Sequence, residues 1–80
     1  MNNNWTIKGI IESKREKPDK NGNNYLILKL VDKEEVIFVF ASKVKEEKWS
    51  WLEEKKEYNF TLEEGNNGSN ILVDYEIEVK

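Results

Sequence analysis

The 80-residue chain carries a formal net charge of −3 at pH 7, and its length predicts one domain, residues 1–80, with a compact core and no room for the deep cleft of an enzyme. Cysteine and histidine are absent, which removes disulfides, thiolate chemistry, the usual zinc ligands and the commonest general base, so we expect no metal, no cofactor and no catalysis. No apolar run approaches the length of a membrane span or a signal-peptide core, which predicts a cytoplasmic protein without a membrane partner.

The charge is unevenly divided along the chain. Residues 1–45 hold nine basic and six acidic side chains, whereas residues 46–80 hold four basic and ten acidic ones. A negative total argues against a nucleic-acid binder, whose affinity comes largely from clustered Lys and Arg, but this asymmetry can create a local positive face. The alternative is that a surface rich in Lys and Glu simply keeps a small domain soluble.

The first predicted strand runs from Trp5 to Lys14 and contains Gly9. A glycine inside a strand marks a sharp bend or a close backbone approach, and a small closed barrel needs one strand bent enough to serve both its sheets. The dipeptide Asn21-Gly22 that follows favours the positive φ of a tight hairpin turn. Trp5, Ile7 and Ile11 are expected to share one face of this strand, with Gly9 between them, and the other face is expected to carry Thr6, Lys8, Ile10 and Glu12.

Between Gly9 and Asp32 the sequence contains a set of residues at characteristic spacings, with no insertion between them. It consists of a glycine, two aliphatics, a small residue, a basic cluster, Lys-x-Gly and Leu-x-Asp, filled by Gly9, Ile10, Ile11, Ser13, Lys14, Arg15, Lys20, Gly22, Leu30 and Asp32. In these residues the first half of the chain resembles the nucleic-acid-binding OB-fold domains of class II aminoacyl-tRNA synthetases and of the bacterial DNA polymerase III α subunit. The resemblance implies a small five-stranded barrel that binds nucleic acid.

The sequence departs from that family at two places. Asp32 is followed by Lys33-Glu34-Glu35 instead of a turn containing glycine, which predicts a tighter hairpin before the third strand. Where the family often has a base-stacking aromatic residue this chain has Ile27, and Tyr25, two residues earlier on the same face, is the proposed replacement.

The loop between the first two strands is basic. It contains Lys14, Arg15, Lys17 and Lys20, offset by Glu16 and Asp19. In OB domains this loop flanks the ligand groove, so these cations are candidates for phosphate contacts. The alternative is a solvated hairpin tip.

The second predicted strand, Tyr25–Asp32, alternates clearly between apolar and mixed residues. Leu26, Leu28 and Leu30 are expected in the core. The opposite face presents Tyr25, Ile27 and Lys29, a mixture with which a sheet stacks bases and holds a backbone. A loop or the N-terminal tail covering this face is the alternative.

The third predicted strand, Val36–Ala41, is apolar throughout, so its phase does not follow from periodicity. Alignment with the family places Ile37 and Val39 inward and puts Phe38 on the outer face with Tyr25, as a second stacking residue. The competing phase buries Phe38 and Phe40 together.

A helix is predicted over Lys43–Lys56, where charged residues are dense and β-branched residues vanish. Its apolar side would combine Val44, Trp51 and Leu52. Trp49 and Trp51 cannot share a helical face, and we expect Trp51 in the core and Trp49 partly exposed.

Two more strands complete the pattern. Tyr58, Phe60 and Leu62 are expected inward in the fourth, and Asn67-Gly68 is expected to reverse the chain. The fifth sets Ile71, Val73, Tyr75, Ile77 and Val79 against an acidic outer face. Five strands with one helix between the third and fourth predict an all-β OB-fold barrel with small α+β content.

The function that follows from this reading is weak binding of single-stranded DNA or RNA, without strong sequence preference and without catalysis. The candidate binding residues are Lys8, Lys14, Arg15, Lys17, Lys20, Tyr25, Ile27, Lys29 and Phe38. The alternative is a protein-interaction module that docks onto a replication, repair or mobile-element partner. The acidic C-terminal half and exposed strand edges support this alternative.

Overall fold

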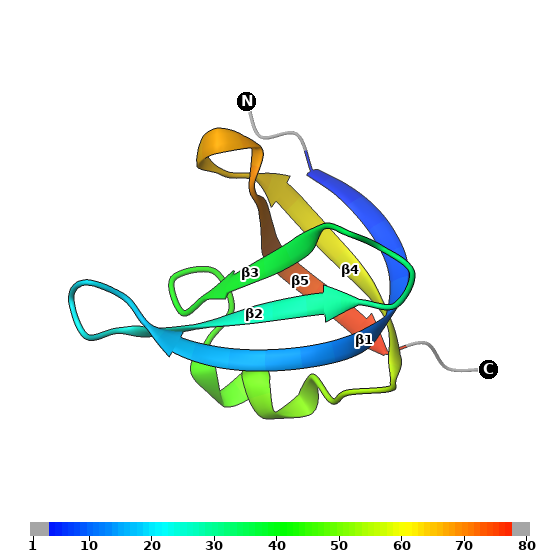
Figure 1. Ribbon diagram of the computed structural model, residues 1–80, viewed down its shortest axis with the longest axis horizontal. Helices are drawn as coiled ribbons and strands as arrows, with labels where there is room; N and C mark the ends of the chain where they lie inside the picture. Colours follow the sequence, from blue (N-terminus) through cyan, green and yellow to red (C-terminus); the bar gives the residue numbers. More distant parts are fainter. Residues whose placement is uncertain (1–3, 78–80) are drawn as a thin grey trace.

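A closed five-stranded barrel makes up most of the chain (Figure 1). The structure is a computed structural model that describes residues 4–77. Around the barrel the strands follow the order β1-β2-β3-β5-β4; β3 and β5 are parallel and all other neighbours are antiparallel. The elements are β1 (Asn4–Pro18), β2 (Asn24–Leu30), β3 (Val36–Phe40), the 3-10 helix η1 (Glu46–Trp51), β4 (Glu57–Glu64), the 3-10 turn η2 (Asn66–Gly68) and β5 (Asn70–Ile77). The predicted order, with one helix between the third and fourth strands, is confirmed.

Strand β1 bends so that it serves both halves of the barrel. Its residues 4–10 pair with β4 and its residues 11–18 pair with β2, with a bulge between Ile11 and Ser13. Next to the bend, a Cβ added at Gly9 would lie 2.8 Å from Cδ1 of the buried Leu30. The glycine therefore allows the close backbone approach that its position in the sequence predicts.

The core is formed by alternating residues of the strands. Inward phases are confirmed for the three leucines of β2, for Ile37 and Val39 of β3, and for the Tyr58, Phe60 and Leu62 row of β4, all of which are fully or almost fully buried. Phe38 and Phe40 point outward and are half-buried, so the competing phase for β3 is wrong. The three residues expected on one face of β1 differ in burial: Ile11 is buried and Ile7 packs against the core, while Trp5 is 38% exposed.

The predicted long helix is replaced by the six residues of η1. Trp49 is the buried residue of η1, and Leu52, three residues later, caps the end of the helix and is buried as well. This spacing matches the three residues per turn of a 3-10 helix. The indole Nε1 of Trp49 donates a hydrogen bond to the Val44 carbonyl at 2.8 Å. Trp51 is 60% exposed, so the expectation that Trp51 is the core residue is wrong. The period of 3.6 assumed for the sequence caused the error.

A bulge in β5 overturns part of its simple alternation. Thr61 of β4 pairs with Asp74, but the next residue, Leu62, pairs with Leu72, which leaves Val73 as the extra residue. Leu72 is fully buried, although strict alternation with an inward Ile71 and Val73 would have turned it outward. Ile77 is 56% exposed instead of inward, and Val79 lies outside the described residues.

Turn residues reverse the chain where predicted. Gly22 and Gly68 both have positive φ (82° and 75°), and Asn67 precedes Gly68 with φ of 62°. Asp32 takes φ of 63°, so an aspartate supplies the left-handed residue for which the family uses glycine. Within residues 4–77 no helix is long and apolar enough to cross a membrane, and no acidic cluster is arranged to hold a metal ion.

Candidate nucleic-acid interface

The outward side chains of β1, β2 and β3 form one continuous surface, which we call the outer array. Residues opposite each other in an antiparallel pair project to the same side of the sheet. Arg15 faces Ile27 and Ile27 faces Phe38, while Lys17 faces Tyr25 and Tyr25 faces Phe40. Together the array consists of Ser13, Arg15 and Lys17 from β1, Lys29, Ile27 and Tyr25 from β2, and Val36, Phe38 and Phe40 from β3.

Three aromatic rings meet at the centre of the outer array. The ring of Tyr25 lies 6.3 Å from that of Phe38 and 5.6 Å from that of Phe40, centroid to centroid. Phe38 and Phe40 are 6.3 Å apart and nearly parallel, with an interplanar angle of 13°. All three rings are half-buried, so each retains a face or an edge for a ligand. Such a cluster is a platform on which flat aromatic groups such as nucleobases can stack.

A groove runs along β3 beside these rings. Its central hollow, of about 270 Å³, is lined by Tyr25, Phe38, Phe40, Ile71 and two residues of the β4–β5 loop, Asn66 and Ser69. Phe40 also lines a hollow of about 210 Å³ toward the β1–β2 loop, and Phe38 lines one of about 340 Å³ toward the β2–β3 turn. Since neighbouring hollows share a ring, they make one groove between the loops.

The β4–β5 loop forms the far wall of the groove. A Cβ added at Gly65 would lie 2.7 Å from Cγ1 of Ile71, so the glycine lets this loop lie against Ile71. Ile71 pairs with Phe38 across the parallel β3–β5 contact and lines the groove with it. Ile71 is buried, at 9% exposed, as its place among the apolar residues of the fifth strand predicts, but it packs beside Phe38 under the loop and not in the barrel interior.

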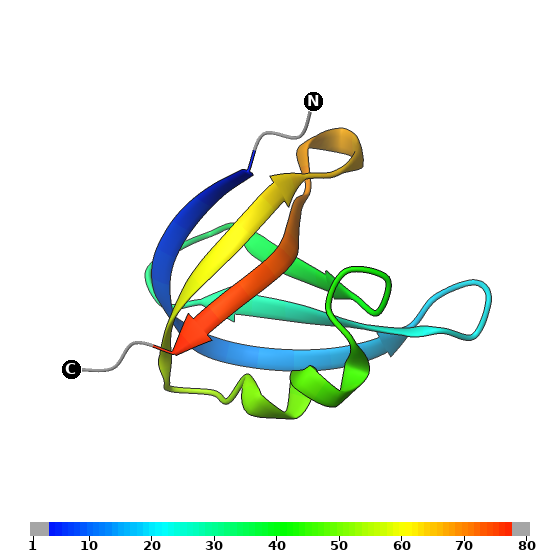
Figure 2. The ribbon, with the colours of Figure 1, turned by 180° about the vertical axis from the view of Figure 1, so that it is seen from behind.

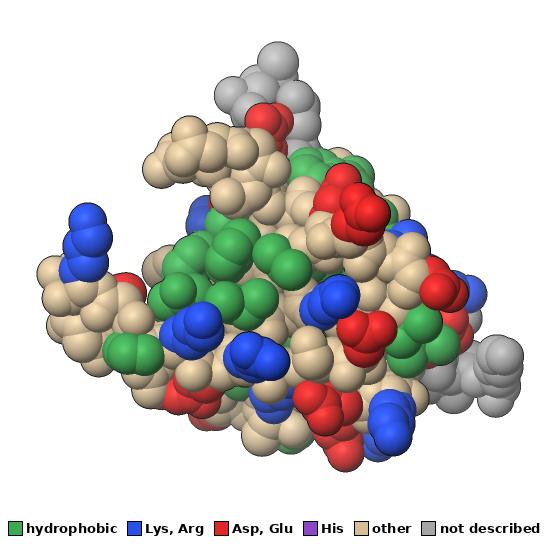
Figure 3. All heavy atoms as spheres, viewed as in Figure 1, with side chains coloured by type: hydrophobic (Ala, Val, Ile, Leu, Met, Phe, Trp, Pro, Cys, Tyr) green, Lys and Arg blue, Asp and Glu red, His purple; other side chains and the backbone are tan. Residues whose placement is uncertain are grey.

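Basic side chains border the aromatic rings on the β1 side. Hydrophobic side chains gather over β2 and β3, and Lys and Arg side chains lie along the adjoining border over β1 (Figure 3). Arg15 and Lys17 are exposed there, and Lys20 is exposed in the hairpin that projects beyond the barrel (Figure 1). Lys29 is 3.3 Å from Glu12; because both side chains are about half exposed, this ion pair holds the lysine only weakly.

Two predicted cations lie away from this group. Lys14 pairs with the buried Leu28, so it projects to the side opposite Arg15, and its Nζ donates a hydrogen bond to the Trp49 carbonyl at 2.7 Å. Lys14 therefore ties β1 to η1. Lys8 pairs with Asn59 on the β1–β4 side of the barrel, and the structure does not bring it to the aromatic rings.

Sequence reasoning missed several residues of the groove. Phe40 follows Phe38 by two positions, so the alternation of β3 would have found it once the phase was known. Asn66, Ser69 and Asn70 carried no signal, because a polar turn after a strand is ordinary.

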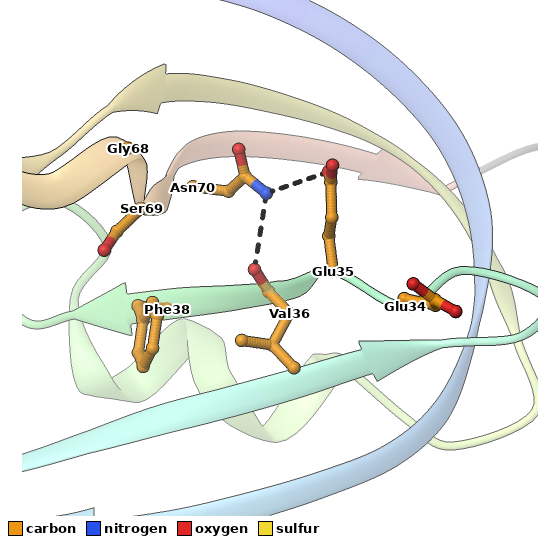
Figure 4. Close-up of a pocket in the computed structure, with 7 residues that line it drawn as sticks. All are labelled: Glu34, Glu35, Val36, Phe38, Gly68, Ser69 and Asn70. Atoms are coloured by element: carbon orange, nitrogen blue, oxygen red, sulfur yellow. Dashed lines mark hydrogen bonds between the residues drawn. The ribbon is translucent and has the colours of Figure 1, made fainter.

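The end of the groove at the β2–β3 turn is acidic and holds an ordered amide. Its lining consists of Glu34, Glu35, Val36, Phe38, Gly68, Ser69 and Asn70 (Figure 4). The Asn70 Nδ2 group donates to Glu35 Oε2 at 3.3 Å and to the Val36 carbonyl at 3.5 Å. Ser69 Oγ donates to the Asn66 carbonyl at 2.9 Å.

A second apolar surface is formed by η1 and β5, which lie together in the view from behind (Figure 2). Trp51 and Ile77, both more than half exposed, line a hollow of about 290 Å³ with Tyr75, Lys48, Asp74 and Glu76. The Tyr75 hydroxyl donates to the Lys48 carbonyl at 2.6 Å, which fixes η1 against β5. None of these residues belongs to the outer array.

Comparison with known proteins identifies the fold. No family model and no curated protein matches the sequence. Five chains of solved structures match, and one of them is the mitochondrial single-stranded DNA-binding protein Rim1 of S. cerevisiae. It superposes with a TM-score of 0.72, covers 96% of this chain and 94% of its own, and is 18% identical. The chain has the OB-fold that the sequence predicted.

Proposed function

We propose that this chain is a non-catalytic domain that binds single-stranded nucleic acid, DNA or RNA, along the groove of β3. The observation that carries the proposal is the outer array, in which three clustered rings stand beside a row of exposed cations. Stacking on aromatic rings and neutralisation of phosphates are the two interactions with which single strands are bound without regard to sequence. The similarity to a protein named for single-stranded DNA binding supports it.

Each part of the array has a role in this proposal. The bases stack on Tyr25, Phe38 and Phe40, and Ile27 extends the apolar surface between the rings and β1. The phosphates lie on the β1 side of the rings, within reach of the cations Arg15, Lys17, Lys20 and Lys29. Since the rings accept any base and the cations contact only the backbone, most of the binding is independent of sequence.

A weak and salt-sensitive interaction is expected. A stacking contact is worth about 1–3 kcal/mol per base, and the affinity of a cation for phosphate falls as salt is added, because counterions are no longer released into a dilute solution. Three rings and four cations form a short site. The proposal therefore places the domain among binders that need either low salt or the help of a linked partner.

Titration of a fluorescein-labelled oligonucleotide at low salt, followed by anisotropy, tests the proposal. The label belongs on the nucleic acid because Trp49 and Trp51 are in η1, outside the groove. Single-stranded DNA and RNA should both bind, and the duplex should bind more weakly because its bases are already stacked. Phe38→Leu keeps apolar bulk but removes the ring, and should weaken binding by about fivefold or more.

Trp51→Leu is the matched control, because it removes an exposed aromatic ring from the opposite surface. Its affinity for oligonucleotides should equal that of the parent chain. Absence of binding by the parent chain at high micromolar concentration would refute the proposal, as would equal losses in Phe38→Leu and Trp51→Leu.

A docking role is the second candidate, favoured by the exposed Trp51 and Ile77 on the η1–β5 surface. Exposed aromatic side chains in a hollow are typical anchors for protein partners, and a replication or repair protein would be such a partner. Tyr25→Ala combined with Lys29→Ala should abolish oligonucleotide binding under the first proposal and leave partner association intact under the second. Trp51→Ala should do the reverse.

A further inference from the structure

The polar side chains at the acidic end of the groove offer acceptors and no spare donors. Glu34 and Glu35 are carboxylates, which only accept hydrogen bonds when ionised. Both hydrogens of the Asn70 amide are directed to Glu35 and to the Val36 carbonyl, which leaves its Oδ1 as an acceptor (Figure 4). The Ser69 hydroxyl gives its hydrogen to the Asn66 carbonyl. The described polar side chains that line this hollow are therefore hydrogen-bond acceptors with no donor left for a ligand.

A hollow that offers only acceptors disfavours the phosphates of a nucleic acid and favours the bases. A phosphate brought next to two carboxylates would meet like charge, and neither Asn70 nor Ser69 has a hydrogen left to offer it. A base is different, because its edge can present N–H groups. The hollow is also bounded by the Phe38 ring, which it shares with the central part of the groove, so a base stacked on Phe38 places its edge there.

From this geometry we infer that the Phe38 end of the groove is a base-reading subsite that prefers bases with an exocyclic amino group. The inference rests on the proposed function and adds to it a preference at one position. Cytosine offers its N4 amino group where thymine and uracil present an O4 acceptor. Where position 4 of the base meets these acceptors, the amino group is bound and the carbonyl is repelled. Glu35 is the principal reader, and Asn70, held in place by it and by the Val36 carbonyl, supplies the second acceptor.

Cytosine and uracil form the sharpest comparison. The two pyrimidines have the same ring size, so stacking on Phe38 is nearly equal. They differ on the hydrogen-bonding edge, where cytosine has an acceptor at N3 and an amino donor at position 4, and uracil has an N–H donor at N3 and a carbonyl acceptor at position 4. Adenine and guanine also carry amino groups, but their larger rings stack more strongly and would mix the two effects. The rest of the groove tolerates any base, so a strand with a single cytosine can slide until that base reaches the subsite.

The experiment compares two labelled deoxyribonucleotide oligomers of about six residues, a length within the range held by one OB domain. One contains only deoxyuridine and the other contains one internal deoxycytidine. The cytidine-bearing strand is expected to bind about fivefold tighter or more, which is the lower end of the discrimination given by a good base-edge contact.

Glu35→Gln identifies the residue responsible. The glutamine amide can turn a donor toward O4, so the ratio of the two affinities should fall toward one, even though loss of a negative charge raises the affinity for both strands. Glu76→Gln makes the same charge change on the exposed outer side of β5, away from the β3 groove. This control should leave the ratio as it is in the parent chain.

Three results would overturn the inference. Equal affinity of the parent chain for both strands would remove the preference while leaving the proposed function standing. A ratio that survives in the double variant Glu34→Gln, Glu35→Gln would assign the preference to another part of the groove. Failure of both strands to bind would refute the proposed function, and the subsite with it.

Discussion

Adjacent residues Lys14 and Arg15 allow a direct test of how the barrel divides its basic side chains. Arg15 stands in the outer array beside Ile27, whereas Lys14 projects to the other side of β1 and donates to the Trp49 carbonyl. We compare Lys14→Met with Arg15→Met, because each removes one positive charge and keeps a similar apolar stem. Any general effect of net charge is therefore the same in both variants.

The two variants should lose different properties. A hydrogen bond to a charged group contributes roughly 1.5–3 kcal/mol, and since Lys14 is half exposed we expect Lys14→Met to lower the free energy of unfolding by about 1 kcal/mol. In a domain of this size that corresponds to a fall in Tm of about 4–8 °C. Arg15→Met should keep its stability within about 0.5 kcal/mol of the parent chain, as is usual for exposed sites.

Binding should show the opposite pattern. Each phosphate contact to a single strand contributes about 0.7 to the slope of log affinity against log salt. Arg15→Met should reduce that slope by about this amount, and Lys14→Met should leave it unchanged. The measurements are thermal unfolding by circular dichroism and anisotropy titrations at four or more salt concentrations. A slope reduced equally by both variants would show that Lys14 reaches phosphate, and would refute the assignment of the two side chains to opposite faces.

Three further predictions concern the packing of η1 on the barrel. Tyr58 is fully buried, and its hydroxyl donates to the Trp51 carbonyl at 2.6 Å and accepts a backbone hydrogen bond at 2.8 Å. Tyr58→Phe should lower the free energy of unfolding, measured by urea denaturation, by about 2 kcal/mol, at about 1 kcal/mol per hydrogen bond. A loss below about 0.5 kcal/mol would contradict this prediction. Trp49→Ala should cost about 3–5 kcal/mol and Trp51→Ala less than about 0.5 kcal/mol, because the first side chain is buried and the second is exposed; the reverse order would restore the sequence-based assignment. Burial raises the pKa of the Tyr75 hydroxyl above its ordinary value of 10.0, so the folded chain holds this proton more tightly than the unfolded chain does. The stabilisation is complete below the unfolded-state pKa and is lost as the pH rises through the folded-state pKa. Tyr75→Phe should therefore lose less stability than the parent chain between pH 9 and pH 11, and equal losses would contradict the prediction.

The strands whose faces differ clearly in polarity could be predicted from the sequence. In β2 the leucines alternate with Tyr25, Ile27 and Lys29, and a shift by one residue would have exposed every leucine, so a single phase was possible. The phase of β3 was decided only by the resemblance to OB domains, because five consecutive apolar residues carry no period.

The errors arose where the local period changes. At three residues per turn, Trp49 of η1 and the cap residue Leu52 are buried together. The sequence contains nothing that distinguishes this from an α-helix whose face would include Trp51. In β5 the extra residue Val73 exchanges inner and outer positions partway along the strand. A bulge is decided by pairing with β4, which is a property of the partner strand as much as of β5 itself.

The groove itself could not be predicted, because it depends on segments far apart in the chain. Phe38 and Ile71 are neighbours only through the short parallel contact of β3 with β5, and the wall of the groove requires Gly65 to lie against Ile71. The sequence signalled a basic half and an acidic half. It could not signal that residues of the acidic half would close the groove opened by the basic half.

If the chain binds nucleic acid as proposed, the arrangement of charge across the groove explains how an acidic chain can do so. The cations Arg15 and Lys17 lie on the β1 side of the rings, and the carboxylates Glu34 and Glu35 lie at the end near the β2–β3 turn. At physiological salt the field of an exposed charge decays over about 8 Å, so acidic residues farther than this from the rings contribute little there. Glu46, which lines the hollow beside Phe40, lies close to the rings. Under the proposed function, the local gradient of charge would draw the phosphates of a bound strand toward β1 and turn its bases toward Phe38. The net charge of −3 then weakens the long-range attraction that brings a strand to the surface, without removing the contacts that hold it there.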